Sequence, residues 1–189
     1  MIGKGKSISH GVAALEYDLA KEISGQAVAT EIARHELYGC TGAEMVQEMK
    51  PYHIDFPNVK NNCLRFEVSP SIEESATFTD ADWAELGNDF MQRMGLANHQ
   101  YIIIRHSGTE SKKEQAHLHI LANRVSLSGE LYRDNWIGKK ATEAANAIAK
   151  ERNFVQSQDI GKVNKAEIKE AMDGVLKKMQ GFDFTKFKE

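Results

Sequence analysis

Three histidines whose spacing could bind a metal ion lie close together in the second half of the chain. His106 ends the run Tyr-Ile-Ile-Ile-Arg-His, and His117 and His119 flank one leucine in the run His-Leu-His-Ile-Leu. Alternate side chains of a β-strand point to one face, so His117 and His119 would share a face. If the two apolar runs pair as a hairpin, His106 can lie beside them. Three neutral imidazoles on one face would form a metal site with open coordination positions.

The same residues have a simpler interpretation. A single strand histidine is usually structural, and a His-x-His pair often arises by chance. The third histidine, at the end of the preceding strand, favours the metal site. His53 lies in a connecting loop over residues 51–61 and is interpreted as a surface histidine rather than a fourth ligand.

The order of these residues resembles motif III of the relaxases, the mobilization nucleases of conjugative plasmids and transposons within the HUH endonuclease superfamily. Here the motif reads His106, a polar loop over 107–115, His117-Leu118-His119 and, after three more residues, Asn123-Arg124. A tyrosine-bearing segment, a strand ending in Ser-Pro and an amphipathic helix precede it in the same order. The resemblance covers about residues 1–152 and is greatest to the mobilization relaxases of Bacteroides-type elements.

The resemblance implies a reaction and a nucleophile. A relaxase nicks one DNA strand at a transfer origin through a tyrosine, which becomes linked to the 5′ phosphate, and the resemblance assigns this role to Tyr17. Tyr38 is the main alternative and Tyr132 a weaker one. The metal would be Mg or Mn in the cell, although imidazole ligands also suit Zn, Co or Ni. The implied partners are single-stranded or supercoiled DNA and the accessory proteins of a relaxosome.

The sequence departs from the family pattern around the histidines. Gly108 stands where the family often has an acidic residue, and Ala116 where it often has proline. Glu110 or Glu114 could supply the carboxylate from the same loop. Lys112 and Lys113 could contact DNA phosphates, or could simply form a solvated hairpin tip.

The residues that follow the histidines suggest supporting roles. Asn123 could orient a histidine from outside the metal site. Arg124 could bind either a phosphate or a structural carboxylate.

Composition indicates a soluble globular protein of a reducing compartment. Of 189 residues, 41% are hydrophobic and 27% charged, and no apolar run approaches membrane-spanning length. Two cysteines and the lack of a signal-peptide pattern favour the bacterial cytoplasm. Residues 16–90 hold fifteen acidic and five basic side chains, so the rest of the chain carries a net +7 within the overall −3. A DNA-facing surface is therefore compatible with an acidic protein, although this basic excess could also be solvated helix surface.

The sequence predicts that an α+β domain with a mainly antiparallel, five-stranded sheet positions these residues. The histidines should lie on one face and the helices on the other. Strands are predicted over residues 1–8, 64–70, 101–106, 117–124 and 125–132. Helices are predicted from Ser9 or His10 to about Ile23, over 27–38, after Thr41 and Thr79, and from Asp134 or Asn135 to Glu151.

The chain divides into a catalytic domain over residues 1–152 and a helical C-terminal extension over 153–189. The extension contains a capping box at Asn164 and Glu167, followed by an apolar stripe. Relaxases of this kind continue into a longer helical region, so the chain is interpreted as a truncated catalytic fragment.

Two other functions remain compatible with the sequence. A rolling-circle replication initiator of the same superfamily would share the histidines and the tyrosine, but such proteins more often place His-x-His before the tyrosine. A metal-stabilised DNA-binding accessory protein without nuclease activity would explain the missing acid at Gly108.

Overall fold

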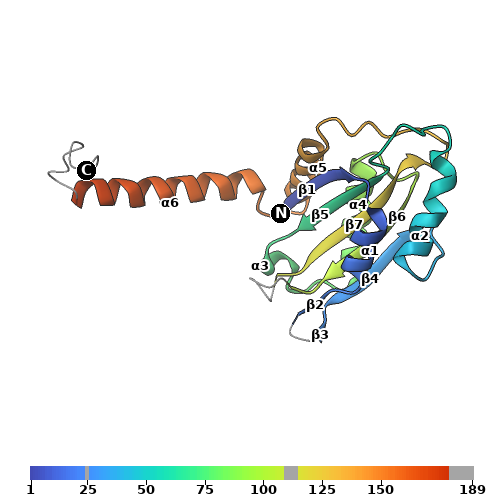
Figure 1. Cartoon of the computed structure of the whole chain (residues 1–189). Helices are drawn as coiled ribbons and strands as arrows, with labels where there is room; N and C mark the ends of the chain where they lie inside the picture. Colours follow the sequence, from blue (N-terminus) through green and yellow to red (C-terminus); the bar gives the residue numbers. More distant parts are fainter. Residues whose placement is uncertain (24–25, 109–114, 179–189) are drawn as a thin grey trace, which may run out of the picture.

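A five-stranded antiparallel sheet forms the centre of the molecule (Figure 1). The structure is a computed structural model that describes residues 1–23, 26–108 and 115–178. The strands lie in the order β1-β5-β7-β6-β4, and each neighbouring pair is antiparallel. Their bounds are β1 Ile2–Ile8, β4 Ala29–His35, β5 Cys63–Ser69, β6 His99–His106 and β7 His117–Ser126. A separate short pair is formed by β2 Glu22–Ile23 and β3 Gln26–Ala27. The predicted α+β class and five-stranded sheet are confirmed.

The central strands β6 and β7 are apolar on both faces. Ile102 and Ile104 point to one face of the sheet and Ile103 to the other, and each is at most 1% exposed. A strand that is buried on both faces reads as a continuous apolar run, which explains why these strands were recognisable in the sequence. The two strands pair as the predicted hairpin, with His106 opposite His117.

Helices cover both faces of the sheet rather than one. Helices α4 (Asp80–Arg93) and α5 (Ile137–Glu151) pack on the face formed by Phe66, Ile103 and Ile120. Helices α1 (Gly11–Leu19) and α2 (Gly42–Met49) pack on the histidine face. The prediction of a single covered face is wrong because Ile102, Ile104 and Leu121 share the histidine face, and this apolar surface requires its own cover.

Residues 27–38 do not form the predicted helix. They form β4, which pairs with β6 along the sheet edge through a bulge between Glu31 and Ala33. Local propensity here is weak, and the hydrogen-bonding groups offered by β6 decide the conformation. Leu37 is buried, whereas the Tyr38 side chain is 76% exposed.

The predicted helix starts after Thr41 and Thr79 are confirmed. Each threonine accepts a hydrogen bond from the third helical N–H, and the acidic side chain at that third position bonds back to the threonine N–H. These reciprocal bonds satisfy donors that a helix start otherwise leaves unpaired. Helix α2 ends at Met49, and a 3-10 turn, η1, follows it directly over Lys50–His53, with Pro51 near its start. A short helix that the sequence did not predict, α3, occupies Ile72–Ser75.

The C-terminal third differs from the prediction in two places. The expected strand over 125–132 is reduced to the end of β7, a turn at Gly129 (φ 83°) and a single bridge between Val125 and Leu131. Helix α6 spans Ser157–Lys178, so it begins before the predicted capping box at Asn164.

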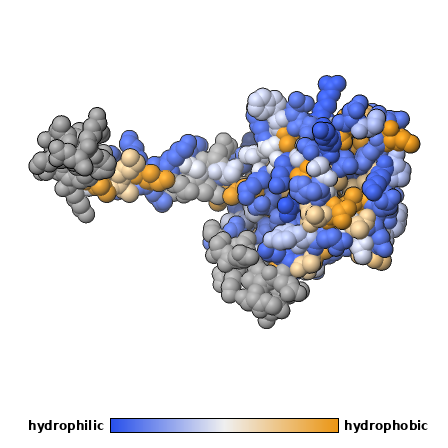
Figure 2. Space-filling view, viewed as in Figure 1, coloured by the Kyte–Doolittle hydropathy of each residue, from blue (hydrophilic) through white to orange (hydrophobic). Residues whose placement is uncertain are grey.

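Helix α6 extends away from the sheet domain, and Ile168, Met172 and Val175 are more than half exposed along it (Figures 1 and 2). On the face of the sheet domain seen in Figure 2, hydrophilic side chains predominate. None of the helices in the described ranges combines the length and apolar character needed to span a membrane.

Strand β1 packs against α5 through a glycine, which gives a direct test of the fold. A Cβ added at Gly3 would lie 2.4 Å from the Ala141 carbonyl oxygen and 2.6 Å from Ala145 Cβ. We therefore expect Gly3→Ala to lower the free energy of unfolding by about 2 kcal/mol through overpacking. Gly138→Ala is the matched control, because its nearest neighbour would be 3.5 Å away. Urea unfolding followed by circular dichroism measures both, and an unchanged Gly3→Ala midpoint would contradict the close packing.

Candidate metal centre

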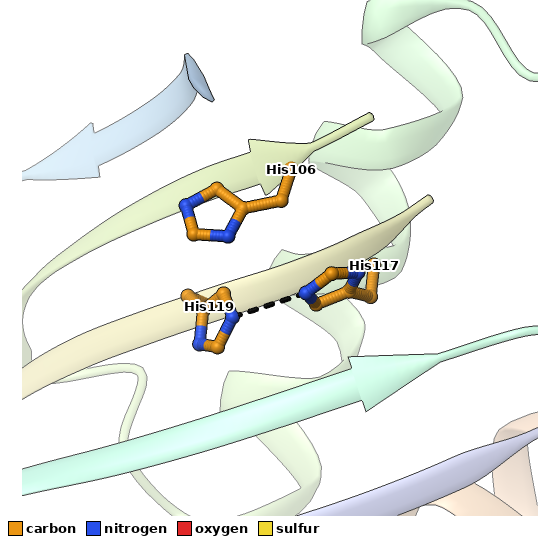
Figure 3. A group of neighbouring side chains, drawn as sticks. All are labelled: His106, His117 and His119. Carbon is orange, nitrogen blue, oxygen red and sulfur yellow. Dashed lines mark hydrogen bonds between the residues drawn. The ribbon is translucent and has the colours of Figure 1, made fainter. Parts of the chain in front are cut away.

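The strands β6 and β7 bring the three histidines together on one face. His106 lies directly opposite His117 in the register, and His119 follows two residues later on the same face of β7. The ring centroids of His106 lie 5.4 Å from His117 and 4.5 Å from His119, and the latter two are 4.9 Å apart. Figure 3 shows the three rings converging from the two strands. We call this group, His106, His117 and His119, the triad.

Burial keeps the triad suited to metal binding. His106 and His117 are 2% and 6% exposed. Burial lowers the pKa of His106, and burial together with the neighbouring histidines lowers the pKa of His119 to about 2. Depressed pKa values favour the neutral imidazole, which is the form that donates a lone pair to a metal ion.

The ligand atoms are grouped so that they could hold a single divalent ion. One ring nitrogen from each residue of the triad lies within 4.8 Å of the others. Nε2 of His117 and Nε2 of His119 face each other at 3.1 Å (Figure 3). Two nitrogens that bind one ion at about 2.1 Å lie roughly 3.0–3.4 Å apart in octahedral or tetrahedral geometry. Three imidazole nitrogen donors suit a divalent transition metal.

Helix α1 brings Tyr17 to this face of the sheet. The backbone oxygen of Asp18, the next residue, accepts a hydrogen bond from His106 Nε2 at 2.7 Å. The Tyr17 side chain is 57% exposed, on a different side of α1 from the buried Leu15, as predicted. Lys21 Nζ lies 2.7 Å from the Tyr17 hydroxyl oxygen and 4.9 Å from the ring centroid, so the ammonium approaches the oxygen rather than the ring face.

Helical spacing in the sequence predicts a buried stripe of Val12, Leu15, Leu19 and Ile23 for this helix, and that prediction needs correction. Val12 is exposed and Ile23 lies beyond the helix, in β2. The buried face consists instead of Gly11, Ala14, Leu15 and Asp18.

The alternative tyrosines lie at the far end of the strands. His35 of β4 pairs with Tyr101, five residues along β6 from His106, so Tyr38 lies beyond a point about 17 Å from that end of the sheet. The ring of Tyr132 packs against His99, the first residue of β6. Neither residue is placed beside the triad, so of the three candidate tyrosines it is Tyr17 that lies on an element in contact with the triad.

The two residues proposed to support the site have other partners. Asn123 is fully buried, and its side chain bonds to His53 Nε2, the Met49 carbonyl oxygen and Gln100. It therefore orients His53 rather than a histidine of the triad, because four residues of strand separate it from His119. Arg124 bonds to Asp134, the structural carboxylate of the two predicted alternatives. Glu110, Lys112, Lys113 and Glu114 lie outside the described residues.

Two charged residues of the site were missed in the sequence. Asp18 is 2% exposed, and Arg65 of β5 binds it with Nε at 3.1 Å and Nη2 at 2.5 Å. Burial raises the pKa of Asp18, and the Arg65 guanidinium opposes this shift. A sequence signal existed, because Asp18 follows Leu15 by three residues and therefore shares its buried helix face.

A basic cavity opens beside the triad, over β1, β5 and β7. Its volume is about 200 Å³, and its lining includes Lys4, Lys6, Arg65, Glu67 and His119. Lys4 lies opposite Glu67 and Lys6 opposite Arg65 in the β1–β5 register. Three cations and one carboxylate give this opening a net positive charge, which favours an anionic ligand.

Comparison with known proteins places the chain in a family. The sequence model of the MobA/VirD2-like relaxase nuclease domain matches residues 17–154, well over half of the chain. Among solved structures, the conjugative relaxase TrwC in a metal-bound complex with oriT DNA is 12% identical, with a TM-score of 0.44 over 85% of this chain and 71% of that chain. No curated protein sequence matches the chain. On the strength of the family match, the chain belongs to the MobA/VirD2-like relaxases and carries their DNA-nicking nuclease domain.

Proposed function

We propose that this nuclease cleaves one strand of a transfer origin by transesterification at Tyr17. The phenolic oxygen attacks the scissile phosphorus and loses its proton. The bond from phosphorus to the 3′ oxygen breaks, and the leaving oxygen takes up a proton. The products are a 5′-phosphotyrosine and a free 3′-hydroxyl, and the phosphodiester bond energy is conserved for rejoining after transfer.

The observation that carries this proposal is the hydrogen bond from His106 Nε2 to the Asp18 backbone oxygen. It holds the last turn of α1 against the triad, and Tyr17 is the adjacent residue. Lys21 supports the assignment because its ammonium donates to the phenolic oxygen. A cation at that position stabilises negative charge on the oxygen, both during attack and when the tyrosine leaves on rejoining.

The triad would hold the divalent metal. When bound there, the ion would bind the non-bridging oxygens of the scissile phosphate and offset the charge that grows on them. The family resemblance implies Mg or Mn in the cell, whereas imidazole ligands by their type suit Zn, Co or Ni. The chain's own contribution is to hold three imidazoles that converge beside the basic cavity.

The cavity and the charge distribution favour DNA as the substrate. Lys4, Lys6 and Arg65 line the opening next to His119, where phosphates flanking the cleaved bond would lie. We propose that residues 1–152 form the catalytic domain and residues 153–189 a C-terminal extension. The reaction would take place in the bacterial cytoplasm on a mobilizable plasmid or transposon, with accessory relaxosome proteins presenting the strand.

The test uses supercoiled plasmid carrying the DNA that flanks the coding sequence of this protein. With Mn²⁺, we expect conversion to the nicked form, with protein attached covalently to the 5′ end and a 3′ end that polymerase can extend. Because the triad needs its ion, excess EDTA should lower the yield at least about 100-fold. Restoring Mn²⁺ should restore cleavage.

Two outcomes would contradict the proposal. Nicked DNA with free 5′ ends would indicate hydrolysis by water rather than attack by tyrosine. Equal cleavage with and without EDTA would remove the metal from the reaction.

A further inference from the structure

A buried carboxylate joins the nucleophile's helix to the metal centre. Asp18 follows Tyr17 directly and is 2% exposed, and Arg65 holds both of its oxygens. Burying an ion pair costs more desolvation energy than a surface pair does, so stability alone is a weak reason for placing it here. The surroundings of the pair indicate a second task.

Asp18 approaches two of the three histidines. Its backbone oxygen accepts from His106 Nε2 at 2.7 Å. Its carboxylate Oδ1 lies 3.9 Å from His119 Nδ1. Arg65 Nη2 lies 3.4 Å from the same His119 nitrogen, so one side of His119 faces a carboxylate and a cation together.

The chemistry of a metal-bound histidine decides between these neighbours. His119 Nε2 faces the other ligand atoms, so its Nδ1 must carry the proton when Nε2 donates to an ion. That N–H needs an acceptor, and a guanidinium has none to offer. Asp18 Oδ1 is an acceptor within a short side-chain movement. Likewise, a His106 that donates from Nε2 to the Asp18 backbone oxygen presents Nδ1 as its lone pair.

We propose that Asp18 is the positioning carboxylate of the metal centre, which replaces the acid missing at Gly108 and fixes His119 through Nδ1, while Arg65 holds Asp18 in place. This inference rests on the proposed role of the triad. Because Asp18 is bonded to Tyr17 through one peptide unit, the same residue that orients a ligand also fixes the position of the nucleophile. A carboxylate behind a metal-binding histidine contributes about 10–100-fold to metal affinity.

The competing carboxylate is Glu67, which gives a matched control. Glu67 lies directly opposite His119 in the β5–β7 register and also lines the basic cavity. Its carboxylate, however, pairs with Lys4 Nζ at 2.9 Å and is about one third exposed. Asp18→Asn and Glu67→Gln remove one charge each from the same neighbourhood.

The experiment measures Mn²⁺ binding to the full chain by titration calorimetry. We expect Asp18→Asn to weaken binding about 10–100-fold. Glu67→Gln should change it less than about threefold, because exposed pairs contribute little. Asp18→Glu keeps the negatively charged carboxylate, whereas Asp18→Asn keeps only a neutral amide oxygen, so Asp18→Glu should recover part of the affinity. Equal losses in Asp18→Asn and Glu67→Gln, or a larger loss in Glu67→Gln, would overturn the assignment.

Removing Asp18 alone leaves Arg65 buried without its partner, so the fold needs a separate control. The double variant Asp18→Asn/Arg65→Met removes both charges, and its thermal unfolding without metal verifies folding. If this folded variant still binds Mn²⁺ weakly, Asp18 acts on the metal centre. If it binds as tightly as wild type, Asp18 serves only to neutralise Arg65 and the proposal fails. Wild-type cleavage with a 5′-linked product would stand in either case, so the two proposals fail separately.

Discussion

Tyr17→Phe is expected to reduce strand cleavage at least about 1000-fold, because removal of a nucleophile leaves only the residual activity of the remaining site. The change deletes one hydroxyl from a side chain that is 57% exposed and contacts Lys21. Stability should therefore change by less than about 0.5 kcal/mol, as for other surface substitutions. Mn²⁺ affinity should also remain unchanged, since the triad and Asp18 are untouched. The measurement is the yield of covalent protein–DNA product from a 5′-labelled or supercoiled substrate.

Tyr38→Phe is the control for this substitution. Tyr38 is 76% exposed and bonds to Glu36 at the far end of the sheet. Its loss should leave the covalent product unchanged. If Tyr17→Phe retained the covalent product while Tyr38→Phe lost it, the nucleophile would be misassigned.

The second large effect is expected from the triad itself. His117→Ala should weaken Mn²⁺ binding at least about 100-fold, because loss of a direct ligand exceeds the effect of a residue behind one. Cleavage at low micromolar Mn²⁺ should fall with it. His117 is suited to this test because its other ring nitrogen, Nδ1, has a local partner, the Gln115 backbone oxygen at 3.2 Å. Calorimetry and the visible absorption of bound Co²⁺ give readouts that do not depend on DNA.

His53→Gln is the matched histidine control. His53 bonds to Asn123, and glutamine keeps a donor for that contact. Metal binding should be unaffected. If folded His117→Ala bound Mn²⁺ as tightly as wild type does, the ion would have ligands other than His117.

The strongest patterns in the sequence concerned the central hairpin. Continuous apolar runs predicted β6 and β7 because both of their faces are buried, and the two-residue period placed His117 and His119 on one face. The capping boxes at Thr41 and Thr79 were equally local, since all their partners lie within three residues. The family resemblance supplied Tyr17, which no spacing rule could connect to histidines about ninety residues later.

The predictions that failed depended on distant partners. Residues 27–38 became β4 because β6 offers an unpaired edge there, and Val12 is exposed because the buried face of α1 includes Asp18 instead. Asn123 lies close to the triad in sequence, yet the rise of β7 carries it to His53 and Gln100. In each case the conformation or the partners of a residue depend on which part of the fold packs against it. The neighbouring residues in the sequence do not contain that information.

The sequence by itself determined the identity and the alignment of the candidate metal ligands, because strand periodicity is a property of the backbone. The tertiary structure decided which side chains contact the histidines from outside the candidate metal site. The loop with Gly108 suggested a missing acid, and packing of α1 on β5 and β7 places Asp18, from the nucleophile's own helix, within 3.9 Å of His119. The distance between a helix near the N-terminus and a strand a hundred residues later is set by the burial of Leu15 against Ile104 and Leu121, a choice that the fold makes as a whole.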